Sequence, residues 1–116
     1  MTQEIDVQTL QELLAQHRPV KVLDVRPAQD RELWWIPGSQ HVDAYESLKH
    51  DSPGALAEVD LPEGQLVVTV CGVGRASTKA AEMLAAQRGI PAVTLRGGMK
   101  SLEPCLEYGV TLVRPR

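Results

Sequence analysis

One cysteine stands where its sulfur could react. Cys71 directly follows the apolar run LVVTV, and it begins the segment CGVGRAST, which holds two glycines and one arginine. Glycines let the backbone turn tightly with N–H groups pointing inward, and a helix that begins near Arg75 adds further unpaired N–H groups. Such a loop favours a thiolate over a thiol, and Arg75 adds a cation. This pattern is typical of an anion-binding loop that could hold Cys71 as a reactive nucleophile.

The same segment has alternative interpretations. Ser77 could donate a hydroxyl hydrogen bond to the sulfur or cap the following helix, and the spacing does not separate these roles. A cysteine at the end of an apolar strand can also be an inert small hydrophobic residue, with the glycines as ordinary turn residues. Cys105 is interpreted as a buried structural residue or as a resolving thiol for Cys71.

Hydrophobic periodicity predicts the elements that position this loop. Apolar residues at helical spacing follow the strand-like EIDV and predict a first helix that ends before Pro19. Strands are expected over 20–25, 66–70 and 92–95, with a further possible strand over 40–44. Helices are expected over 27–35 and 75–88, with one or two short helices within 44–59, a final helix or pair of turns over 97–109, and an edge strand or tail over 110–113.

Strands that alternate with helices predict an α/β fold. We expect a single domain over residues 1–116, with a three-layer α/β/α architecture around a central, mostly parallel sheet of about five strands. In such sheets, sites form at the carboxyl ends of strands. Cys71 stands at one such end, Asp24 and Arg26 at another, and Arg96 at a third.

Composition excludes several classes of function. The net charge of −3 offers no basic surface for nucleic acid. No apolar run approaches the roughly 20 residues of a membrane-spanning helix, and the N-terminus lacks the pattern of a secretion signal. We therefore expect a cytoplasmic protein with no nucleic-acid or membrane partner. Two cysteines and three scattered histidines predict neither a disulfide scaffold nor a metal site.

Four segments of the chain are CGVGRAS, VLDVRPAQDRE, WIPGSQHV and AAEMLAAQRGIPAVTLRGGMKSL, and together they resemble the rhodanese family of sulfurtransferases. CGVGRAS is similar to the family's active-site loop C-x-x-G-x-R-S at Cys71, Gly74 and Ser77. VLDVRPAQDRE resembles its D-V-R strand end, and WIPGSQHV resembles its H-I-P-G-A-x-x-I turn and strand. AAEMLAAQRGIPAVTLRGGMKSL is similar to its helix, strand and G-G-M-x-x-W segment. The order and spacing agree from about residue 5 to residue 110.

Three positions depart from the family pattern. Ala76 stands where many members carry the arginine of the loop, and Arg75 beside it offers the positive charge instead. Trp35 replaces the histidine before IPG, and Leu102 replaces the tryptophan after GGM. The first departure leaves the choice of donor open, whereas the other two are interpreted as packing changes near the site.

The resemblance implies a sulfurtransferase that needs no metal or other cofactor. Cys71 would take the outer sulfur of a small anionic donor such as thiosulfate, carry it as a persulfide, and pass it to cyanide, a thiol or a sulfur-acceptor protein. Asp24 and Arg26 would support the loop. The residues expected to bind the substrate are Gly72, Val73, Gly74, Arg75, Ala76 and Ser77.

Two other functions compete with this one. Phosphatases related to rhodaneses use a cysteine, five intervening residues and an arginine, but the sixth position after Cys71 is Ser77. The other alternative is a rhodanese-like binding or regulatory module without turnover, which the presence of Cys71 disfavours.

Overall fold

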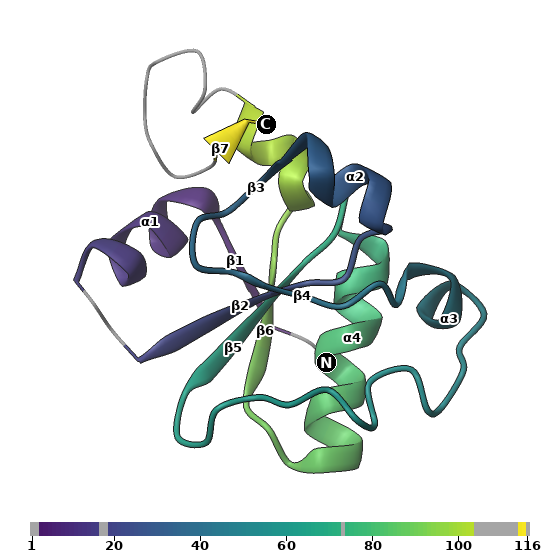
Figure 1. The fold of residues 1–116 in the computed structure, drawn as a ribbon. Coiled ribbons are helices and arrows are strands. Elements are labelled where there is room, and N and C mark those ends of the chain that lie inside the picture. The colour runs from purple at the N-terminus through teal and green to yellow at the C-terminus, as the bar shows by residue number, and fades with distance from the viewer. Residues whose placement is uncertain (1–2, 17–18, 73, 104–113, 116) are drawn as a thin grey trace.

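Five parallel strands form the central sheet, in the order β1-β6-β5-β2-β4 (Figure 1). The computed structural model describes residues 3–16, 19–72, 74–103 and 114–115. The strands of this sheet are β1 (Glu4–Ile5), β2 (Val20–Asp24), β4 (Gln40–His41), β5 (Leu66–Val70) and β6 (Ala92–Leu95). The predicted α/β class with a mostly parallel sheet of about five strands is confirmed.

Helices follow most of these strands. They are α1 (Val7–Ala15), α2 (Ala28–Leu33), α3 (Tyr45–Lys49), α4 (Arg75–Arg88) and the 3-10 helix η1 (Gly98–Leu102). Asp6 caps α1, because its carboxylate accepts a 2.8 Å hydrogen bond from the Thr9 amide. The same amide is the largest cause that holds the pKa of Asp6 below its ordinary value. Gly89 ends α4 with a φ of +63°, as its position in the sequence predicts.

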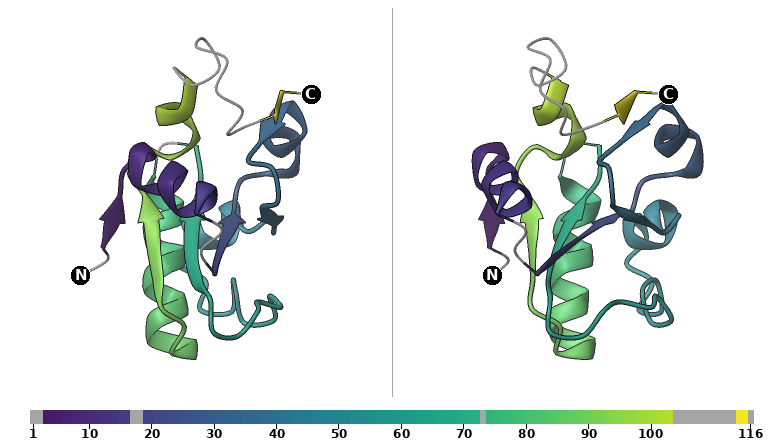
Figure 2. Two further views of the ribbon diagram at one scale, coloured as in Figure 1. Left: turned by 90° about the vertical axis from the view of Figure 1, so that its left-hand side faces the viewer. Right: turned by 60° about the vertical axis from the view of Figure 1, so that its left-hand side comes forward.

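Helices cover both faces of the sheet, with α1 on one side and α4 on the other (Figure 2), and a layer of buried apolar side chains lies under each. Side chains alternate along β5, so Val68 and Val70 pack with α1 and η1, while Val67 and Cys71 pack with α3 and α4. On the α4 side the buried helix residues are Ala76, Ser77, Ala80, Ala81 and Leu84. This face of α4 places the start of the helix against the end of β5, where Cys71 lies.

The predicted helix over 27–35 is wrong in its last two residues. Helix α2 ends at Leu33, and the extended backbone of Trp34 (φ −167°, ψ 157°) begins a short strand, β3 (Trp34–Trp35). This strand pairs antiparallel with β7 (Arg114–Pro115). Aromatic residues favour extended backbone, and the Trp34 carbonyl accepts a 2.7 Å hydrogen bond from Arg26. Tertiary contacts therefore override the helical pattern.

The remaining elements refine the prediction. Within 44–59, one helix forms at Tyr45–Lys49 and turns follow it. The GGM segment forms the 3-10 helix η1, whereas the continuation expected over 104–109 and the strand or tail expected over 110–113 lie outside the described residues. Among the helices that the structure describes, none is long and apolar enough to cross a membrane.

Candidate active site

The Cys71 sulfur lies inside a short strand-to-helix connection, which we call the cysteine loop (residues 71–77). Its Sγ accepts hydrogen bonds from the backbone N–H groups of Gly74, at 3.0 Å, and Ser77, at 3.4 Å. Gly74 has a φ of +104°, a region that favours glycine, and this conformation turns the chain into α4. Two amides thus point at one sulfur, an arrangement that stabilises negative charge there. Val73, a predicted loop residue, lies outside the described residues.

Ser77 lies beside the sulfur, as one of its two predicted roles requires, but it does not cap α4: it lies inside the helix, whose N-terminus has no side-chain capping hydrogen bond. While Cys71 carries its proton, the thiol donates to the Ser77 hydroxyl at 3.4 Å, and the Ser77 hydroxyl donates to the carbonyl of Gly74 at 3.2 Å. Gly74 is the residue that precedes the first turn of α4. The side chain is fully buried, so bulk water cannot take the place of these hydrogen-bond partners.

Burial and hydrogen bonding coincide at Cys71. The residue is 1% exposed and packs in the apolar layer beneath α3 and α4. This burial is what a packing role for Cys71 predicts. Two backbone N–H groups also point at its sulfur, which is the arrangement expected of an anion-binding loop.

A second backbone segment holds the cysteine loop from outside. The N–H of Met99 donates to the carbonyl of Cys71 at 2.7 Å, and the N–H of Lys100 donates to the carbonyl of Gly72 at 3.1 Å. Gly98 has a φ of +62°, and a Cβ atom on it would lie 2.4 Å from the Cys71 carbonyl oxygen. Residue-by-residue reading of the sequence missed this role of Gly98. The adjacent glycines of GGM were the available signal.

The cysteine loop borders a cleft of about 710 Å³ between α3 and α4. Its lining residues are Tyr45, Lys49, Gly74, Arg75, Ala76, Thr78, Lys79 and Glu82. Lys79 is 2.9 Å from the carboxylate of Asp51, whereas Arg75 is exposed and makes no ion pair with the described residues. Ala76 is 4% exposed and packs in the apolar layer. The cleft therefore carries cations on Arg75, at the loop, and on Lys49, of α3, together with the carboxylate of Glu82.

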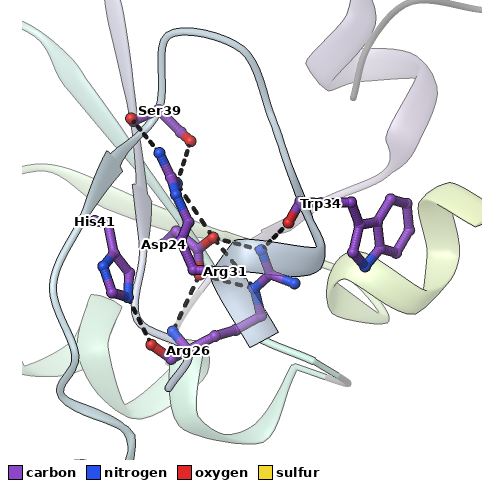
Figure 3. A network of polar contacts seen from close by, with 6 residues as sticks. All are labelled: Asp24, Arg26, Arg31, Trp34, Ser39 and His41. Atoms are coloured by element: carbon purple, nitrogen blue, oxygen red, sulfur yellow. Dashed lines mark hydrogen bonds and ion pairs between the residues drawn. The ribbon is translucent and has the colours of Figure 1, made fainter. Parts of the chain in front are cut away.

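A smaller cleft of about 370 Å³ reaches the loop at Gly72 and is also lined by Arg26 and Lys100. Arg26 belongs to the buried polar network drawn in Figure 3. Its guanidinium binds Asp24 through Nε at 3.0 Å and through a terminal nitrogen at 2.8 Å. Both side chains are at most 4% exposed. The Val25 N–H between them donates to the Val70 carbonyl at 2.9 Å, which ties this network to the residue before Cys71.

Arg31 joins the network, and nothing in its local sequence beyond its place in α2 predicts this role. It lies 3.3 Å from the Asp24 carboxylate and donates to the Ser39 hydroxyl at 2.6 Å (Figure 3). The ring of His41 makes a 2.8 Å hydrogen bond with the Arg26 carbonyl. The Asp24 carboxylate thus faces two guanidinium groups and connects β2 to the turn before β4.

Other sequence candidates lie away from the sulfur. The Arg96 guanidinium is 3.8 Å from the Glu4 carboxylate, beside β1, and lines neither of the two clefts described above. Leu102 is fully buried in the layer beneath α1, which agrees with a packing role. Trp35 is half-buried beside Arg31. Cys105 lies outside the described residues, and within the described part of the chain no group of three metal-ligating side chains forms.

The chain thus combines a parallel α/β sheet with a cysteine in a hydrogen-bonded loop at the carboxyl end of a central strand. The model of the rhodanese-like domain matches residues 6–104, and the chain belongs to this family. No curated protein matches the chain.

Solved structures with the same fold agree with this assignment. A rhodanese homologue from the extremely thermophilic bacterium Thermus thermophilus is 30% identical over 86% of this chain and all (100%) of its own, with a TM-score of 0.64. A rhodanese-like domain protein from Staphylococcus aureus is 25% identical over 86% of this chain and 90% of its own, with a TM-score of 0.68. A thiosulfate sulfurtransferase from Pseudomonas aeruginosa is 19% identical and shares the fold over 98% of this chain but only 20% of its own, with a TM-score of 0.70.

Proposed function

We propose that this protein is a sulfurtransferase in which Cys71 carries the transferred sulfur as a persulfide. The observation that supports it most is the pair of backbone N–H groups, from Gly74 and Ser77, directed at Sγ. These donors stabilise a thiolate before the reaction and the sulfur anion formed during it. The similar fold of the thiosulfate sulfurtransferase from Pseudomonas aeruginosa adds support for the reaction class.

The reaction proceeds in two displacements. The Cys71 thiolate attacks the outer sulfur of thiosulfate, the S–S bond of the donor breaks, and sulfite leaves with the bonding electron pair. A thiolate or cyanide then attacks the outer sulfur of the persulfide, takes it as a new persulfide or thiocyanate, and returns the Cys71 thiolate.

The charges around the loop fit an anionic donor. Arg75 is exposed at the end of the larger cleft that the cysteine loop borders, and Lys49 lies in the same cleft. Cations there raise the local concentration of an anion such as thiosulfate. We propose that Arg75 attracts the donor, while the loop residues Gly72, Val73, Gly74, Ala76 and Ser77 shape the binding site. Asp24 and Arg26 act as structural support for the loop.

The acceptor that the protein uses in a cell is proposed to be a thiol, free or on a partner protein, and the reaction is proposed to take place in the cytoplasm.

The second candidate function is a non-catalytic binding module. The 1% exposure of Cys71 favours this candidate, because a donor must reach a nearly covered sulfur.

Intact-protein mass spectrometry after incubation with thiosulfate separates the two functions. A sulfurtransferase gains the mass of one sulfur atom, loses it when cyanide is added, and shows no gain in Cys71→Ser. The Cys105→Ser variant is the matched control and keeps the gain. A wild-type protein that gains no sulfur from thiosulfate or from an organic persulfide would leave the binding module as the better function.

A further inference from the structure

Behind Ser77, the threonine of β6 contacts the hydroxyl that lies beside the reactive sulfur. The Oγ1 of Thr94 lies 2.7 Å from the Oγ of Ser77, and Ser77 Oγ lies 3.4 Å from the sulfur of Cys71. Thr94 and Ser77 are both fully buried. Two hydroxyl groups thus form a chain from the middle of the sheet to the sulfur.

The partners of the Gly74 carbonyl decide where the Ser77 hydrogen can go. That carbonyl already accepts the Thr78 hydroxyl at 2.7 Å and the Thr78 N–H at 3.2 Å. The Ser77 hydroxyl also donates to this carbonyl, at 3.2 Å, but a carbonyl oxygen has two lone pairs, so this third donor is not needed to satisfy it. The hydrogen of Ser77 is therefore available to the sulfur once Cys71 has lost its own proton.

The orientation of the Thr94 hydroxyl controls this availability. If Thr94 donates to Ser77, the hydrogen of Ser77 is left for the sulfur. If Thr94 instead donates to the Thr69 carbonyl, 3.3 Å away, Ser77 can donate to Thr94 and the sulfur loses a donor. The shorter 2.7 Å contact favours the first arrangement, and a hydroxyl that accepts a hydrogen bond becomes a stronger donor.

We propose that Thr94 is a positioning residue that holds the Ser77 hydroxyl as a hydrogen-bond donor to the Cys71 thiolate. This inference rests on the proposed function of Cys71 as a nucleophile. Thr94 touches neither the sulfur nor the substrate in this arrangement and acts through Ser77. By holding Ser77 in this orientation, Thr94 lets the Ser77 hydroxyl act as a third donor to the sulfur beside the two backbone amides.

The neighbouring strand supplies a matched control. Thr69 is paired with Thr94 in the register of β5 and β6, and it is equally buried. Its hydroxyl donates to the Ser77 carbonyl at 2.7 Å, so it contacts the backbone of Ser77 and not the side chain. Thr94→Val and Thr69→Val each remove one buried hydroxyl with little change of shape, but only the first removes the donor to Ser77 Oγ.

The experiment measures the rate at which iodoacetamide alkylates Cys71 as a function of pH, followed by mass spectrometry on the Cys71 peptide. Loss of the hydroxyl in Thr94→Val moves the midpoint of this profile upward by about half to one pH unit. Thr94→Ser keeps a hydroxyl and restores the wild-type midpoint, and Thr69→Val moves it much less. Thr94→Ala also lacks the hydroxyl and should give the same upward shift, so it replaces Thr94→Val in the test if that variant folds poorly.

A double variant tests whether Thr94 acts through Ser77. Ser77→Ala alone raises the midpoint, and adding Thr94→Val to it causes no further shift. Equal midpoints in Thr94→Val and Thr69→Val, or a full additional shift in the double variant, would overturn the proposal.

Alkylation does not require sulfur transfer, so this experiment tests the role of Thr94 separately from the proposed function. If the wild-type protein forms no persulfide but the variants show these shifts, only the proposed function is contradicted. If the wild-type protein forms a persulfide and the variants show no shifts, only the role of Thr94 is contradicted.

Discussion

The backbone carbonyl of Cys71 accepts a 2.7 Å hydrogen bond from the N–H of Met99, so the first turn of η1 holds the start of the cysteine loop. The contact brings together two segments that are far apart in the sequence. The two segments approach so closely that Gly98, the residue before Met99, has no room for a side chain, because its Cβ would lie 2.4 Å from the same carbonyl oxygen.

Replacing Gly98 with alanine should therefore displace the cysteine loop. The positive φ of Gly98 adds strain to the steric overlap, and we expect the free energy of unfolding to fall by about 1–3 kcal/mol, as for other overpacked sites. Persulfide formation should fall further than the loss of folded protein explains. Urea denaturation and the mass assay measure the two effects. Gly54→Ala is the control, since nothing lies within 4 Å of a Cβ at that position.

The ion pair between Asp24 and Arg26 should matter to stability far more than a surface pair. Both side chains are at most 4% exposed, so Asp24→Asn leaves a buried guanidinium without its carboxylate. We expect a loss of about 3–5 kcal/mol in the free energy of unfolding, measured by urea denaturation. Asp51→Asn removes an exposed ion pair with Lys79 and should cost roughly 0–1 kcal/mol. Similar losses in the two variants would contradict the supporting role of Asp24.

Arg75 and Arg96 should differ in their effect on the donor. Arg75 lines the cleft beside the loop, whereas Arg96 lies by Glu4. Arg75→Gln should raise the KM for thiosulfate by about 2- to 5-fold and weaken its dependence on ionic strength, with a smaller change in kcat. Arg96→Gln is the matched control and should leave the KM unchanged. Steady-state kinetics at several salt concentrations provide the comparison, and an unaltered KM in Arg75→Gln removes Arg75 from the site.

The packed face of α4 should carry much of the stability of the fold. Leu84 is fully buried in the layer that also contains Cys71. Leu84→Ala should lower the free energy of unfolding by about 2–5 kcal/mol, because it removes apolar contacts and leaves a cavity. Leu33 is 67% exposed, so Leu33→Ala should change stability by less than about 0.5 kcal/mol. Thermal or chemical denaturation distinguishes them.

Local pattern in the sequence was enough to locate the main strands and the helix after Cys71. The run LVVTV has the apolar character of a central parallel strand, and Gly74 and Gly89 mark the two ends of α4. The same local reasoning failed at Trp34 and Trp35, because their extended conformation depends on pairing with residues near the other end of the chain.

The sequence by itself determined the α/β class, the place of Cys71 at a strand end, and the glycines that let backbone amides approach its sulfur. Those features follow from periodicity and from the conformations that each residue allows. Only the tertiary structure decided that η1 holds the cysteine loop, that Arg31 joins the Asp24 network, and that Thr94 lies behind Ser77. These contacts join residues on different elements, so they depend on strand register and on how the layers pack, which no local pattern encodes.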